Sequence, residues 1–338
     1  MHPKLIRSSH DWKSPTGKWS STGKIPPSSL RKSMPGRCPT SVGRRRRTFV
    51  VFGIQSPLNG LGVTLHRIPT TLAKIHRREL VRALWAELFA TTILVYCATG
   101  SAAATGQVLG DGSGAPLKAN VARLLPIATA SGVSVSVLAF SFQAISGAHM
   151  NPVVTLAMVL YNKFDPVLGL LYCLVQFVGS VLGVLLLWAC ISGVSWNPPK
   201  GMDLTGFVPG MSVIPSVGYP PFALGLPLLS PLITPANGLL LETMGTMILV
   251  LTVLLVGLNP KYVEMAPLPI GFVVWVLNMV LIPWTGCGIN PARVFGAMFV
   301  NLVAEGEDGF GVFWWVYYLG PLLGSLLAVG LAKFLTSA

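Results

Sequence analysis

Six apolar stretches, each close to the length needed to cross a lipid bilayer, dominate the 338-residue sequence after residue 79. A transmembrane helix needs roughly 20 predominantly apolar residues. Only 10% of the residues are charged, whereas an average soluble domain has about 25%. The sequence therefore predicts an all-α membrane protein rather than a soluble enzyme, with spanning helices near 80–102, 121–144, 166–192, 235–258, 267–286 and 312–335.

Two shorter apolar segments lie between the predicted spans. One, at 151–160, follows the second span, and the other, at 290–300, follows the fifth. About ten residues are too few to cross a bilayer, so each segment is predicted to be a re-entrant half-helix. Both segments begin with Asn-Pro, and proline is favoured in the first turn of a helix.

The same order of motifs occurs twice along the chain. Glu87 lies four residues before Thr91 in the first span, Glu242 lies four residues before Thr246 in the fourth, and each half has Asn-Pro after its second span. Because each half has three spans, an odd number, the second copy must cross the membrane in the opposite sense, as in other inverted repeats that form solute pathways. We predict a channel domain at 79–336, with repeats at about 79–192 and 235–336 and an extramembranous loop at 193–234.

Basic charge is concentrated at the start of the chain. Residues 1–82 hold 17 of the 24 Lys and Arg and 2 of the 11 acidic residues, a net charge of +15, whereas the remainder has 7 basic and 9 acidic residues, a net of −2. The segment 1–78 is rich in Ser, Pro, Gly, Lys and Arg, which predicts a disordered polybasic tail. We expect this tail to contact anionic lipid; an organellar transit peptide is the competing hypothesis, and no motif indicates nucleic acid as a partner.

The side on which the basic residues lie predicts the orientation. With six spans, the tail, Lys163 and Lys261 fall on one side, while Lys118 and Lys200 fall opposite. The positive-inside rule then predicts cytoplasmic N- and C-termini in a multi-pass integral membrane protein. The plasma membrane is the expected location, and an organellar membrane is the alternative.

Two boxes carry a resemblance to a known family. The segment 146–155 reads SGAHMNPVVT and the segment 285–293 reads TGCGINPAR. Together with the six spans and the repeated Glu, they resemble the aquaporin (major intrinsic protein) family over about residues 80–335, and Gln176 and Gly320-Pro321 are similar to family positions. The resemblance implies a passive channel for water and small neutral solutes in the lipid bilayer, a homotetramer with one pore per subunit, and no cofactor.

The physical role of the boxes follows from charge. Two half-helices that point their N-termini at the channel centre present about +0.5 charge each, which repels cations and hydronium. Asn151 and Asn290 are expected to cap these helices while each turns an amide N–H toward the solute. The pore constriction is accordingly expected at Asn151, Pro152, Val153, Asn290, Pro291 and Ala292. Val153 stands where the family has alanine, and we expect it to alter the pore width.

The resemblance places the selectivity filter at Ser131, Asn278, Cys287 and Arg293. Arg293 is expected to give donors to the solute and to repel cations. Strict water channels typically hold Phe and His at the first two positions, so Ser131 implies a wider, more polar constriction.

Other residues around the filter point toward water channels. Val294 follows Arg293 where glycerol channels place Asp, and Tyr317 and Tyr318 keep aromatic residues where water channels usually have them. We predict a water channel with a relaxed filter. The alternative is a broad aquaglyceroporin-like channel for glycerol, urea, ammonia or hydrogen peroxide, and the remote alternative is a non-conducting membrane scaffold.

The remaining polar residues of the channel domain are expected to support the structure. Glu87 and Glu242 are expected to hold loop backbone amides beside the half-helices, with Gln176 as a further structural support, because an unpaired carboxylate inside a span is costly. His149 is expected to bond loop backbone, with pH gating as the alternative. The sequence contains no nucleophile–base set, phosphate-binding loop or metal-ligand cluster, so we predict neither an enzyme nor a metal site. Of the five cysteines, the resemblance places Cys287 in the pore wall.

Overall fold

The computed structural model describes residues 77–108, 116–191, 225–230, 232–305 and 313–337, with backbone alone at 105–108, 116–123 and 304–305. The predicted tail at 1–78 therefore lies outside the described residues except for its last two positions. Most of the predicted loop at 193–234 lies outside them as well.

Every regular element in the described part of the chain is helical. Six of the described helices are long and apolar enough to cross a membrane, one of them being α5 together with the π-helix η2 that continues it. The long elements are α1 (Arg77–Val108), α2 (Pro116–Phe142), α4 (Pro166–Ile191), α5 (Pro235–Thr252), η2 (Val253–Gly257), α6 (Pro267–Thr285) and α8 (Val316–Thr336). The spans therefore lie close to their predicted positions.

Two shorter helices, α3 (Pro152–Leu160) and α7 (Pro291–Glu305), complete the set. They have 9 and 15 residues, and at about 1.5 Å per residue both are shorter than the roughly 30 Å hydrocarbon core of a bilayer. We call α3 and α7 the half-helices. Asn151 caps α3, because its Oδ1 accepts from Val153 N at 3.1 Å. In the same way Asn290 Oδ1 accepts from Ala292 N at 3.0 Å at the start of α7.

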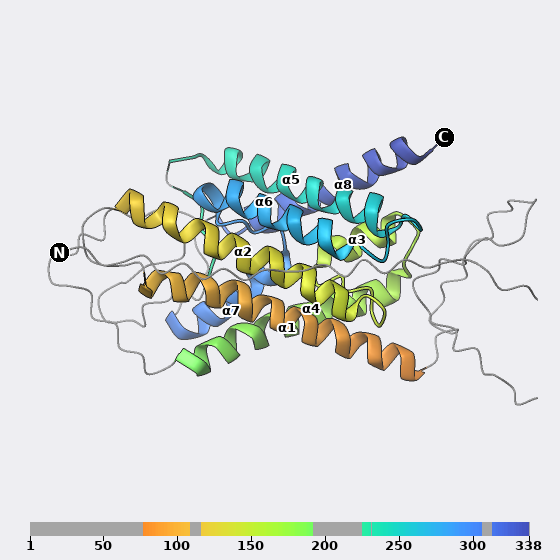
Figure 1. Cartoon of the computed structure of the whole chain (residues 1–338), viewed down its shortest axis with the longest axis horizontal. Coiled ribbons are helices and arrows are strands. Elements are labelled where there is room, and N and C mark those ends of the chain that lie inside the picture. Colours follow the sequence, from red (N-terminus) through yellow and green to blue (C-terminus); the bar gives the residue numbers. More distant parts are fainter. Residues whose placement is uncertain (1–76, 109–115, 192–224, 231, 306–312, 338) are drawn as a thin grey trace, which may run out of the picture. The chain divides into compact units, whose positions relative to one another are not determined.

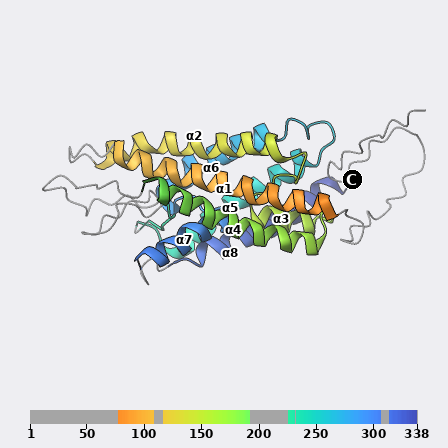
Figure 2. The ribbon, with the colours of Figure 1, turned by 90° about the horizontal axis from the view of Figure 1, so that it is seen from below.

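The long helices pack in an arrangement that follows the repeat. The most extensive helix contacts pair α1 with α4, α5 with α8, and α2 with α6 (Figures 1 and 2). In the first two pairs a glycine sits against the backbone of the neighbouring helix. A Cβ on Gly179 would lie 2.6 Å from Leu88 O, and one on Gly324 would lie 2.3 Å from Thr243 O. Small residues thus allow the helices to approach closely at equivalent points of both repeats.

The first turns of α1 and the end of α8 lie beside the half-helix α3. Leu80, Val154 and Ala332 belong to one apolar cluster, and the Tyr161 hydroxyl is 2.8 Å from Thr336 Oγ1. In Figure 1 these segments lie at the same end of the bundle.

The last residues before α5 also pack into the bundle. Leu226 is 5% exposed and joins a buried cluster with Val95 and Tyr317. The described end of the predicted loop at 193–234 therefore packs against the helices.

Candidate functional site

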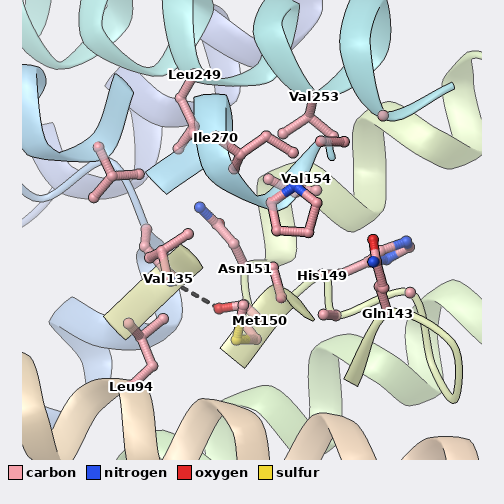
Figure 3. Close-up of a pocket in the computed structure, with 18 of the residues that line it drawn as sticks. Leu94, Val135, Gln143, His149, Met150, Asn151, Val154, Leu249, Val253 and Ile270 are labelled. Atoms are coloured by element: carbon pink, nitrogen blue, oxygen red, sulfur yellow. Dashed lines mark hydrogen bonds between the residues drawn. The ribbon is translucent and has the colours of Figure 1, made fainter. Parts of the chain in front are cut away.

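A cavity of about 350 Å³ lies where the half-helices meet. Asn151 and Asn290 both line it, and so do the four residues predicted as a filter, Ser131, Asn278, Cys287 and Arg293. Figure 3 shows Asn151 and His149 in the wall of this cavity, together with the apolar side chains of Leu94, Val135, Val154, Leu249 and Ile270. The tertiary structure thus brings the predicted Asn pair and the predicted filter residues to one cavity.

Each asparagine is fixed by the loop of the other repeat. Asn151 Nδ2 donates to Ile289 O at 3.0 Å, and Asn290 Nδ2 donates to Met150 O at 2.8 Å (Figure 3). A side-chain amide has two N–H donors. One hydrogen of each amide is therefore used across the repeat, and the other is available to a molecule in the cavity.

The two loops that precede the half-helices have the same unusual backbone. Ala148 and Cys287 have φ of 52° and 58°, and Met150 and Ile289 have φ of 49° and 38°. Positive φ is uncommon for residues other than glycine. The matching positions are evidence at the level of backbone geometry that the two boxes are equivalent.

Glu87 and Glu242 lie beside these loops and accept hydrogen bonds from them. Glu87 accepts from His149 N at 2.9 Å, Met150 N at 2.8 Å and Ser146 Oγ at 2.7 Å. Glu242 accepts from Gly288 N at 2.9 Å, Ile289 N at 2.7 Å and Thr285 Oγ1 at 2.6 Å. Hydrogen bonds to ionised groups are stronger than those between neutral groups, so the carboxylates fix the strained loop backbone.

Three of the four filter residues, Ser131, Asn278 and Arg293, keep a polar group available to a solute. Asn278 Nδ2 donates to Val274 O at 2.8 Å, and since a main-chain carbonyl can only accept, Oδ1 must point away from it. Arg293 Nη1 is buried and has no hydrogen-bond partner among the described residues. Ser131 Oγ likewise has no hydrogen-bond partner among the described residues. The cavity therefore offers both donors and acceptors.

Aromatic side chains do not line the cavity in the described part of the chain, apart from the imidazole of His149. Tyr317 is 2% exposed and donates to Thr285 O at 2.8 Å. Tyr318 donates to Met298 Sδ at 3.7 Å. The two tyrosines stand where water channels usually have aromatic residues, and in this structure their hydroxyls bond protein atoms.

Only some of the residues expected at the constriction line this cavity. Among the residues of the first box, Asn151 and Val154 line the cavity, whereas Pro152 and Val153 do not. Val153 is 4% exposed and lies within the protein. The side chain of Val153 is therefore buried and does not form the wall of this cavity. Pro291 and Ala292 of the second box likewise lie outside the wall.

His149 is held chiefly by side chains. Its Nδ1 is 3.1 Å from Thr155 Oγ1, and its ring centroid is 4.8 Å from that of Phe164 and 5.4 Å from that of Tyr172. The hydrogen bond at Nδ1 goes to the Thr155 hydroxyl group. Gln176 joins the same network, because its Nε2 donates to Glu87 at 2.9 Å and to Thr155 at 3.1 Å.

Two residues that the sequence analysis missed contact the half-helices directly. Ser180 of α4 and Ser325 of α8 donate hydrogen bonds to carbonyl oxygens in the first turns of α7 and α3. A signal for them was present in the sequence, because each follows a glycine at the same place in its repeat, Gly179-Ser180 and Gly324-Ser325.

Metal binding finds no support within the described residues, where no group of three or more His, Cys, Asp or Glu side chains could hold an ion. The four described cysteines, Cys97, Cys173, Cys190 and Cys287, are free thiols.

Known proteins share both the sequence pattern and the fold. The chain is 32% identical over 255 residues to an aquaporin-8 from Botryotinia fuckeliana, and the aligned segment covers 75% of this chain and 68% of that protein. It is 30% identical over 262 residues to an aquaporin-1 from Ovis aries, covering 75% and 82% of the two chains. The X-ray structure of the aquaglyceroporin from Plasmodium falciparum matches the fold with a TM-score of 0.61, at 21% identity, over 76% of this chain and 98% of that one.

The family model of the major intrinsic proteins matches residues 74–331. This range contains the first five candidate spans, all but the last five residues of the sixth, both half-helices and every residue that lines the cavity. The chain therefore belongs to the major intrinsic protein family, the aquaporin family of membrane channels.

Proposed function

We propose that the chain forms a passive channel for water with a relaxed selectivity filter, which also admits small neutral solutes. The observation that carries the proposal is one cavity lined by Asn151, Asn290 and the four filter residues, with no Phe, Tyr or Trp among the described residues of its wall. Pore width and lining donors decide which neutral molecules pass.

Exclusion of ions and protons is proposed to rest on the half-helices and Arg293. The first turns of α3 and α7 meet at the cavity, which concentrates positive potential there. A water molecule beside the Asn pair accepts hydrogen bonds from both amides. It is then badly oriented to continue a proton-conducting chain.

The filter is proposed to be wider than that of a strict water channel. Ser131 contributes a small hydroxyl where an aromatic ring would fill space, and the two nearby tyrosines are turned into the protein. The accessible groups of Ser131, Asn278 and Arg293 can bond to a solute that has donors and acceptors of its own. For this reason a broad channel for glycerol, urea, ammonia or hydrogen peroxide is the second candidate.

Stopped-flow light scattering on proteoliposomes tests the proposal, with water, glycerol and urea gradients run on the same preparation. We expect fast water flow and measurable solute entry above that of protein-free liposomes. Fast entry of glycerol and urea at rates that rival water would favour the broad channel. Flow equal to that of empty liposomes for every solute would contradict both candidates and favour a scaffold.

Assembly and orientation belong to the same proposal. We infer a homotetramer with one pore in each subunit and cytoplasmic termini, in the plasma membrane or an organellar one. Lys163 lies two residues after Tyr161, whose hydroxyl is 2.8 Å from Thr336 Oγ1 at the end of α8, and Lys261 follows η2, which packs against α3 and α8. Both lysines are therefore near the end of α8, which supports this orientation. Cross-linking in the membrane tests the tetramer, and protease protection of a tag at each terminus tests the orientation.

A further inference from the structure

Two buried serines, one in each repeat, hold the first turns of the half-helices. Ser180 Oγ in α4 donates to Ala292 O at the start of α7. Ser325 Oγ in α8 donates to Val153 O at the start of α3, at 2.9 Å. Both serines are fully buried. A hydroxyl in such a position is expected to have a partner, and here the partner is backbone of the pore-forming segments.

The two contacts are equivalent under the inverted repeat. Each serine follows a glycine in the third long helix of its own repeat, and each bonds the half-helix of the other repeat. The carbonyls that accept the bonds, of Val153 and Ala292, both lie two residues after the Asn of their box. The bonds therefore couple the two repeats at the same distance from the asparagines on both sides.

The contact between Ser180 and α7 is also sterically close. A Cβ placed on Gly296 of α7 would lie 2.1 Å from Ser180 Oγ and 2.6 Å from the Ser180 carbonyl oxygen. Only glycine lets α7 sit this near α4, so Ser180 fixes both the distance and the direction of the half-helix. Directional bonds of this kind hold functional groups to the sub-ångström tolerance that a site needs.

The residues that follow Val153 and Ala292 explain why the placement of these two carbonyl groups matters. Arg293 comes directly after Ala292 and Val154 comes directly after Val153, and both Arg293 and Val154 line the cavity. We propose that Ser180 is a positioning residue that sets the place of the Arg293 guanidinium in the filter, and that Ser325 sets the wall formed by Val154. Ser180 thereby controls which solutes pass, whereas Ser325 controls how fast water passes.

The inference rests on the proposed channel function, and a comparison of Ser180→Ala and Ser325→Ala tests it. The matched control is Ser141→Ala, since Ser141 Oγ bonds Val137 O of its own helix at 2.8 Å on an exposed face. Water and glycerol permeabilities are measured on the same proteoliposomes. Their ratio is independent of how much protein is incorporated, so a merely structural loss does not change it.

We expect Ser180→Ala to raise the glycerol-to-water ratio by roughly fivefold, the factor that corresponds to one typical hydrogen bond. Ser325→Ala is expected to lower water permeability while it leaves the ratio within about twofold, since its contact lies away from Arg293. Ser141→Ala is expected to match the original protein. If Ser180→Ala does not assemble, Ser180→Cys keeps the size and a weak donor and gives the same comparison.

A double variant separates positioning of Arg293 from a general change of shape. In an Arg293→Val background, Ser180→Ala should not change the ratio further, because no guanidinium remains to be positioned. An equal change in that background would overturn the inference, as would an unchanged ratio in the single variant. Both results leave the proposed channel function standing, whereas absence of water flow in the original protein removes that function.

Discussion

Replacing Gly324 by alanine provides a sharp test of the close contact between α5 and α8. The same helix carries a matched control, because a Cβ on Gly330 would meet no atom within 4 Å. The two substitutions are chemically identical and lie on one helix. They differ only in whether a neighbouring helix occupies the space of the added methyl group.

The magnitude follows from the contact distances. At Gly324 the new Cβ would lie 2.3 Å from Thr243 O and 2.9 Å from Met247 N, and both are backbone atoms that cannot rotate away. To restore ordinary contact, the helices must separate by about 1 Å, and overpacking of this kind typically costs about 1–3 kcal/mol. Alanine gains up to about 1 kcal/mol of helix propensity over glycine at either position. The difference between the two variants therefore isolates the steric cost.

Thermal unfolding in one detergent, followed by tryptophan fluorescence, measures this difference. We expect Gly330→Ala to unfold at or above the temperature of the original protein, and Gly324→Ala to unfold well below it. For a chain of this size each kcal/mol shifts Tm by about 2–4 °C. Equal midpoints for the two variants would refute the argument, because they would mean that the helices do not meet as closely as the glycine contact requires.

Three further predictions concern the cavity. Mercury should inhibit water flow by reacting with Cys287, which lines the cavity. Cys287→Ser should lose most of this inhibition, whereas Cys190→Ser should retain it. Inhibition by mercury that is unchanged in Cys287→Ser would contradict the assignment. Ser131→Phe should lower the glycerol-to-water ratio, because the ring fills part of the cavity, and a ratio that stays constant in the stopped-flow assay would argue against Ser131 as a filter residue. Glu242→Gln should lower both water permeability and Tm, because an amide cannot accept all three hydrogen bonds that the carboxylate receives. One lost charge-assisted hydrogen bond is worth about 1.5–3 kcal/mol. Full activity with an unchanged Tm would show that the carboxylate is dispensable.

Local sequence was sufficient for the elements and for the repeat. Apolar length predicts the six spans, since a bilayer requires about 20 apolar residues wherever the helices end up in space. The half-helices follow in the same way, because Pro after the Asn cap marks the start of α3 and of α7. The resemblance to the aquaporin family also predicts that Asn151, Asn290 and the four filter residues belong to one pore, although only the fold brings them to one cavity.

The sequence alone did not predict the direction in which each side chain points. Val153 and Val154 are adjacent and identical, yet only Val154 lines the cavity, because successive residues on a helix face directions about 100° apart. Tyr317 stands where water channels usually have an aromatic residue, but only the fold shows that its hydroxyl donates to Thr285 O and that its ring is buried. The direction of these side chains depends on neighbouring residues that are distant in the chain.

Contacts between the repeats were also decided only by the tertiary structure. Ser180 and Ser325 look like small residues that help helices pack, and nothing local reveals that each reaches a carbonyl more than one hundred residues away in the chain. The sequence determined which segments cross the membrane and which carry the polar groups of the site, because burial of apolar surface and helix capping are local properties. The structure alone determined where those polar groups point, because the partners of a buried hydrogen bond are set by the packing of the whole bundle.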